Sequence, residues 1–71
     1  MKTKTYIINL KYGIWENQLW LVGEDSPEWE KKWDDAKAGL DELADNSRGS
    51  GEFFTKAIEH FGSYGFTRIQ K

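Results

Sequence analysis

Residues 5–23 read TYIINLKYGIWENQLWLVG, and the spacing of their apolar side chains predicts two neighbouring strands. In residues 5–12 an apolar or aromatic side chain recurs at every second position, which is typical of a half-buried strand. Residues 18–23 are apolar on both faces through Leu19–Val22, which suits a central strand. We therefore predict a β-hairpin over residues 5–23.

The turn of this hairpin is expected at Glu16-Asn17, because Asn tolerates a positive φ. Gly13 offers a second place to bend. With the turn at Glu16-Asn17, Trp15 faces Gln18 and Gly13 faces Trp20. One face of the sheet then carries Tyr6, Ile8, Leu10, Tyr12, Ile14, Leu19 and Leu21. The other face carries Ile7, Trp15, Trp20 and Val22.

The second of these faces is a candidate interface. A two-layer fold leaves one face of its sheet open to water, and a patch of two Trp with Ile and Val is larger than scattered exposed apolar residues. Two alternatives stay open: the register is different, or a loop covers the patch. We predict partner binding through Ile7, Trp15, Trp20 and Val22.

Two helices and a last strand follow the hairpin. Ser26 is suited to cap a helix, and Pro27 fits its first position. Apolar residues at helical spacing then predict a helix over 27–45, slightly weakened by Gly39. The stripe on this helix is Trp29, Trp33, Ala36, Leu40 and Leu43. A second helix is expected over 52–61, ending at Gly62, with the stripe Phe54, Ala57, Ile58 and Phe61.

The predicted last strand spans 66–70, so the order is β-β-α-α-β. This order predicts an α+β two-layer sandwich in which two helices cover one face of a three-stranded, mainly antiparallel sheet. We expect strand order 1-2-3, with the apolar second strand in the middle. A parallel pairing of the last strand with the first is the alternative. The 71 residues make one domain over 1–71.

The composition excludes several classes of protein. The chain has no Cys, so disulfides, thiolate nucleophiles and Cys-based zinc sites are excluded, and a cytoplasmic location is expected. No apolar run is long enough for a signal peptide or a membrane span. Four Trp, four Phe and three Tyr supply the large side chains that a small core needs.

The middle of the chain is acidic, with nine Asp or Glu against three Lys in residues 24–45. The net charge of −2 argues against direct nucleic-acid binding. Neighbouring acids on a helix point about 100° apart and do not converge on one ion or substrate, so a solvated face is expected. Three pairs are spaced as surface ion pairs: Lys31–Asp35, Lys37–Asp41 and Glu28–Lys32. The acidic residues expected to meet a basic partner surface are Asp34, Asp35, Asp41 and Glu42.

Catalytic and metal sites are not expected. The single histidine, His60, lies in the second predicted helix with no nucleophile near it in sequence, so it is interpreted as a surface or boundary residue. The glycine-rich segment 48–51 lacks the Lys and Ser/Thr of a phosphate-binding loop. We therefore expect no enzyme activity, no cofactor and no metal.

The end of the chain, Phe53 to Ile69, resembles the ends of many small bacterial and phage domains: an amphipathic helix, a Gly-x-x-Gly-aromatic segment and a strand. The short, Trp-rich profile with its acidic centre is similar to that of phage-encoded accessory proteins. That resemblance implies a protein-binding or inhibitor module of a phage or mobile element, acting on a larger host protein. The alternative is a homo-oligomeric scaffold domain, such as a homodimer, that pairs through the open sheet face.

Overall fold

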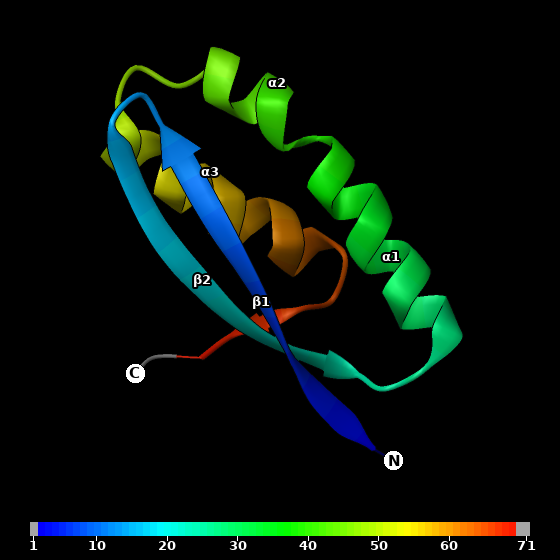
Figure 1. Cartoon of the computed structure of the whole chain (residues 1–71). Coiled ribbons are helices and arrows are strands. Elements are labelled where there is room, and N and C mark those ends of the chain that lie inside the picture. The colour runs from blue at the N-terminus through cyan, green and yellow to red at the C-terminus, as the bar shows by residue number, and fades with distance from the viewer. Residues whose placement is uncertain (1, 70–71) are drawn as a thin grey trace.

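The computed structural model describes residues 2–69, which fold in the order β-β-α-α-β with the first predicted helix in two pieces (Figure 1). The elements are β1 Thr3–Tyr12, β2 Trp15–Glu24, α1 Pro27–Ala38, α2 Leu40–Asp45, α3 Ser50–Ser63 and β3 Thr67–Arg68. The sheet is antiparallel with strand order β1-β2-β3. The predicted fold class and strand order are confirmed, and the parallel alternative is wrong.

The hairpin turns at Gly13-Ile14, so the predicted turn at Glu16-Asn17 is wrong. Tyr12 and Trp15 pair directly beside the two-residue loop. Gly13 has φ of +61°, a left-handed conformation that glycine adopts without a steric penalty. Two-residue loops with a glycine first match the twist of antiparallel strands better than a turn without glycine.

The observed register changes the predicted sheet faces at two positions only. Trp20 pairs with Ile7 instead of Gly13, a displacement of six residues. Since side chains alternate along a strand, an even displacement keeps Ile7, Trp20 and Val22 on the open face, as predicted. Trp15 now belongs to β2 and lies on the helix face, while Ile14 leaves the predicted core and is fully exposed at the turn.

The last strand is short and begins after a helix end that fixes its position. Gly65, at φ of +103°, follows α3, and the N–H of Phe66 donates to the carbonyl oxygen of Phe61 at 3.1 Å, a Schellman motif. The helix therefore runs past Gly62, where its end was predicted. The ladder reaches Ile69, whose N–H donates to the Trp20 carbonyl at 2.9 Å. Gln70, the end of the predicted strand, lies outside the described residues.

The predicted helix 27–45 begins as expected but breaks at Gly39. Ser26 caps α1 by accepting from the N–H of Trp29 at 3.3 Å. At the break, Nε2 of His60 lies 2.9 Å from the carbonyl oxygen of Ala36. A β-carbon at Gly39 would lie 3.2 Å from the His60 ring. His60 thus joins α3 to the junction of α1 and α2, which is a structural role at a helix boundary.

The core lies between the sheet and the helices and is mostly aromatic. Its buried hydrophobic residues are Tyr6, Leu10, Leu19, Leu21, Trp33, Ala36, Phe53, Ala57, Phe61 and Phe66. Phe53, which the predicted stripe omitted, is the buried member of its pair, whereas Phe54 is half-buried at the margin. Phe54 there contacts Trp15, with ring centroids 5.9 Å apart, so the margin of the core includes the displaced tryptophan.

Candidate functional site

The layer of helices is wider than the sheet that it covers. Helix α3 lies behind the sheet, while α1 and α2 follow β1 on its outer side (Figure 1). Packed helices lie about 8–10 Å apart and paired strands about 4.8 Å apart. Two helices side by side are therefore about as wide as four strands. Within the described residues, the sheet has only two long strands and a third strand of two residues. As a consequence, α1–α2 overhangs the free edge of β1.

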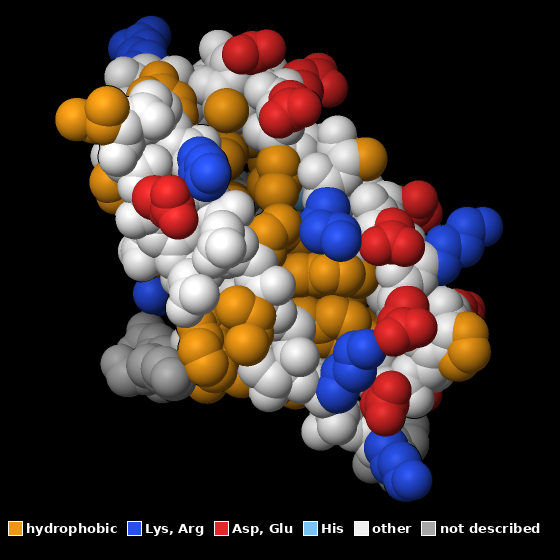
Figure 2. Space-filling view, viewed as in Figure 1, with side chains coloured by type: hydrophobic (Ala, Val, Ile, Leu, Met, Phe, Trp, Pro, Cys, Tyr) orange, Lys and Arg blue, Asp and Glu red, His pale blue; other side chains and the backbone are white. Residues whose placement is uncertain are grey.

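A groove runs beneath this overhang, between β1 and α1–α2. Its first part is a cavity of about 400 Å³ between residues 4–7 of β1 and Glu30, Trp33 and Asp34 of α1. Its second part, about 190 Å³, lies between residues 9–11 of β1, residues 40–44 of α2 and Phe53. Figure 2 shows apolar side chains along the floor, between the surface of the strand and a helix rim that carries charged groups.

The edge of β1 presents unpaired backbone groups to this groove. The Trp20 carbonyl accepts from Ile69 in β3, so it points away from β1. The Gln18 N–H donates to Oδ1 of Asn17 at 2.9 Å and is likewise not used in the β1–β2 ladder. In an antiparallel pair that is not hydrogen-bonded, both residues point their backbone groups outward. Ile7 and Asn9, the partners of Trp20 and Gln18, therefore point theirs toward the free edge, with which no strand within residues 2–69 pairs.

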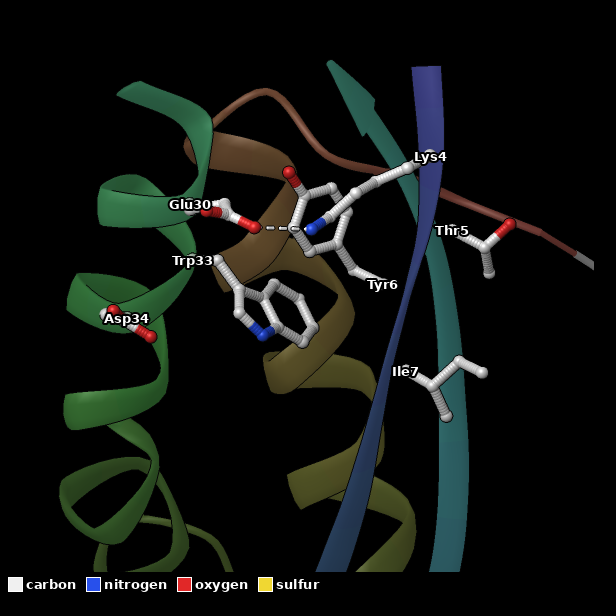
Figure 3. A pocket seen from close by; sticks show the side chains of 7 residues that line it. All are labelled: Lys4, Thr5, Tyr6, Ile7, Glu30, Trp33 and Asp34. Carbon is white, nitrogen blue, oxygen red and sulfur yellow. Dashed lines mark hydrogen bonds and ion pairs between the residues drawn. The ribbon is translucent and has the colours of Figure 1, made fainter. Parts of the chain in front are cut away.

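An ion pair crosses the first part of the groove. Nζ of Lys4 on β1 lies 2.6 Å from Oε1 of Glu30 on α1, and 4.8 Å from the centroid of the Tyr6 ring (Figure 3). Beneath this ion pair, the ring centroids of Tyr6 and Trp33 lie 5.0 Å apart. The hydrogen bond that Lys4 donates to Glu30 raises the pKa of Lys4 above its usual value. The side chain of Lys4 thus covers an aromatic floor.

Tyr6 is the polar member of that floor. Its hydroxyl donates to the carbonyl oxygen of Glu24 at 2.8 Å. Its ring is buried, and this burial raises the pKa of the phenol above its usual value. The phenol therefore anchors β1 to the end of β2 while its ring supports Trp33.

A second lysine approaches the same floor from the helix. Nζ of Lys37 lies 5.9 Å from the centroid of the Trp33 ring and 3.4 Å from Oδ1 of Asp34. Two aromatic rings and two exposed carboxylates, those of Glu30 and Asp34, therefore surround the ammonium groups at this end of the groove. Such surroundings favour positive charge.

The structure divides the predicted acidic site in two. Asp34 and Asp41 line the groove, one in each cavity. Asp35 and Glu42 are exposed but line neither cavity. The ion pairs also differ from those predicted: Lys37 pairs with Asp34, three residues before it in the same helix.

The predicted site on the open sheet face is also only partly assembled. Ile7 and Trp20 lie opposite each other there, and Ile69 continues the row beside Trp20. Ile7 is 47% exposed, and Trp20 and Val22 are half-buried. Trp15 is absent from this face because its ring packs edge-on against Phe53 and Phe54. The open patch is therefore smaller than predicted.

Lys4 and Glu30 were missed as site residues by sequence reasoning. One signal was present: alternation places Lys4 on the same face of β1 as Tyr6 and Leu10, so a charge stands on the apolar side of an amphipathic strand. Glu30 carries no comparable signal, since acidic residues are common in the first turn of a helix.

Within residues 2–69, no three His, Asp or Glu side chains gather closely enough to hold a metal ion. The helices in the same range are too short and too polar to cross a bilayer. No protein-family model matches the chain, and no curated protein or solved structure gives a significant match. The groove itself is therefore the basis for any functional proposal.

Proposed function

We propose that this domain is a non-enzymatic protein-binding module that takes up an extended segment of a partner protein as an extra strand on β1, beneath α1–α2. The observation that carries the proposal is the overhang of α1–α2 beyond a strand edge whose backbone groups at Ile7 and Asn9 point outward. An added strand would pair with that edge and cover the apolar floor of the groove, the mode of recognition known as β-augmentation.

The geometry favours a partner segment over a second copy of this chain. Antiparallel pairing of two β1 edges about a twofold axis keeps both helix layers on the same face of the joined sheet. Each α1–α2 would then extend over the other copy's β1, whereas helices need about 8–10 Å between their axes. An extended segment without its own helix layer meets no such conflict. Occupying the segment of a larger protein in this way also suits an inhibitor.

Selection from a random peptide library, followed by NMR mapping, tests the proposal. We expect selected peptides to shift the backbone amide signals of Ile7 and Asn9 and to slow their hydrogen exchange. Asn9→Pro should abolish binding, because proline lacks the N–H that an added strand needs. Gln18→Pro is the matched control, since Gln18 lies opposite Asn9 and its N–H is outside the β1–β2 ladder.

Thermal melts of both proline variants establish that they fold. Peptides that bind Asn9→Pro as tightly as the parent protein would contradict strand addition. Peptides that shift only signals of the open face, at Trp20 and Ile69, would place the binding surface there instead.

Self-association through the open sheet face is the second candidate function, in keeping with a scaffold role. The row formed by Ile7, Trp20 and Ile69 favours it, because β1, β2 and the residue directly after β3 each contribute an apolar side chain. Sedimentation equilibrium distinguishes this candidate: a dimer that Ile7→Thr dissociates supports it, and a monomer at high concentration excludes it.

A further inference from the structure

We infer that the segment bound in the groove carries a Lys or Arg side chain that docks on Tyr6 and Trp33 between Glu30 and Asp34, a place that Lys4 occupies in the free protein. This inference rests on the proposed function and names the chemistry of the partner. It makes Lys4 an internal substitute for part of the ligand.

The groove around Lys4 is built for a cation. Its floor is aromatic, and the ammonium of Lys4 lies 4.8 Å from the Tyr6 ring centroid, within the range of a cation–π contact. Its helix rim supplies the carboxylates of Glu30, which pairs with Lys4, and of Asp34, which pairs with Lys37 outside the cavity lining. A neutral or acidic side chain would lose both interactions, whereas a guanidinium or ammonium would keep them.

Lys4 is suited to be replaced by an incoming group. Its side chain is 35% exposed and that of Glu30 is 57% exposed, and ion pairs this exposed are weak. An inward-pointing charge on an edge strand is also one of the ways by which proteins prevent unwanted strand pairing. Lys4 therefore hinders strand pairing at this edge when the groove is empty. When a segment with its own cation binds, the Lys4 side chain moves into solvent.

The position of an added strand agrees with this exchange. Neighbouring strands lie about 4.8 Å apart, so the added strand would run beside the free edge of β1, over the Lys4–Glu30 ion pair that spans from β1 to α1. Its side chains alternate between the open face and the helix face. Those on the helix face would enter the cavity that Glu30, Trp33 and Asp34 line.

Three synthetic peptides test the inference, each acetylated, amidated and fluorescently labelled, of sequence Thr-Val-Thr-Xaa-Thr-Val-Thr-Val-Thr. The alternation places Val and Xaa on one face, and Xaa is Lys, Gln or Glu. We expect the Lys peptide to bind about tenfold more tightly than the Gln peptide by fluorescence anisotropy, and the Glu peptide to bind most weakly. The preference should shrink in high salt.

Two variants of the full chain separate the cation site from general charge effects. Glu30→Gln should reduce the preference for Lys over Gln, because only Asp34 and the aromatic floor remain, while leaving binding of the Gln peptide nearly unchanged. Lys4→Met should strengthen binding of the Lys peptide severalfold, because the place becomes vacant while the apolar stem is kept. Lys31→Met, on α1 but outside both cavities, changes the net charge equally and should strengthen binding much less than Lys4→Met.

The outcomes distinguish this inference from the proposal on which it rests. Equal affinity for the Lys and Gln peptides, with Asn9→Pro abolishing both, would overturn the cation site and leave strand addition standing. Failure of all three peptides to bind at the edge of β1 would overturn both. Equal strengthening by Lys4→Met and Lys31→Met would reduce the effect to net charge and overturn the exchange with Lys4.

Discussion

The ring centroids of Trp33 on α1 and Tyr6 on β1 lie 5.0 Å apart, and this contact joins the overhanging helix to the edge of the sheet. Trp33 also packs on Phe61 of α3, with ring centroids 4.9 Å apart. The Trp33 side chain therefore connects α1 to both the sheet and α3. The groove and the core share this residue, so damage to one is expected to reach the other.

Trp33→Ala should remove much of the stability of the domain. Truncation of a buried aromatic costs about 3–5 kcal/mol, and a chain of this length has a total stability of a few up to about 10 kcal/mol. Chemical denaturation followed by circular dichroism measures the change. A midpoint within error of the parent protein would contradict the packing described for Trp33.

Trp15→Ala and Trp20→Ala test the observed register as a pair. Trp15 packs against Phe53 and Phe54, so its truncation should cost about 2–3 kcal/mol. Trp20 is half-buried on the open face, and its truncation should cost about 1 kcal/mol. Parallel thermal melts compare the two effects, and a loss for Trp15→Ala as small as that for Trp20→Ala would favour the turn at Glu16-Asn17, which places both rings on the open face.

Gly13→Ala should destabilise the hairpin through its backbone alone. A β-carbon at Gly13 would meet no atom within 4 Å, so no clash contributes. The left-handed φ of +61° costs a residue with a β-carbon about 1–2 kcal/mol. Gly13→Asn, which tolerates this conformation better, should cost less. Equal denaturation midpoints for the two variants would speak against a turn centred on Gly13.

Stability should fall at alkaline pH because of Tyr6. Its pKa is raised in the folded protein by burial, so the neutral phenol is favoured there. The associated stability is fully present below the pKa of an unfolded tyrosine, about 10, and is lost as the pH rises through the higher pKa of the folded state.

The alkaline loss can be assigned to Tyr6 with one substitution. Tyr6→Phe should lower stability at neutral pH by about 1 kcal/mol, through loss of the hydrogen bond to Glu24. It should also flatten the alkaline decline in urea titrations. Lys4→Met keeps the phenol and should therefore still lose stability at alkaline pH. If Tyr6→Phe loses stability at alkaline pH as much as the parent protein does, Tyr6 is not the cause of the loss.

The acidic residues should differ in their effect on binding according to their place. Asp34→Asn with Asp41→Asn should weaken binding of a basic extended peptide, because both line the groove. Asp35→Asn with Glu42→Gln removes the same charge outside it and should leave the dissociation rate nearly unchanged, with a modest slowing of association. Stopped-flow measurements separate the two rates. Equal effects of the two double variants would show that long-range charge alone acts.

The strands and most of their faces could be predicted from alternation, except at Ile14 and Trp15, and the order could be predicted from the apolar second strand. The turn could not be placed, since Gly13 and Asn17 both permit a bend and the choice depends on ten cross-strand pairs formed together. At Gly39 the sequence indicated a weakened helix but not a break, because the break coincides with a contact from His60, far away in the chain.

The groove lay beyond sequence reasoning for a similar reason. The sequence indicates individual acidic and apolar residues that line the groove, but their grouping depends on where α1–α2 lies relative to β1. The position of that helix is set by long-range packing of Trp33 on Tyr6 and Phe61. Only Lys4 stood out of its local pattern, as a charge on an apolar strand face.

The pairing beside the turn also bears on how the length of this chain can vary in evolution. Loss of Tyr12 together with Trp15 would leave Lys11 and Glu16 flanking the turn, with every remaining pair intact. Loss of one residue from a single strand would exchange the two faces of that strand from the deletion to the turn. A change of one residue in a single strand at the tip of the hairpin is therefore expected to disrupt the sheet more than the loss or gain of one residue in each strand.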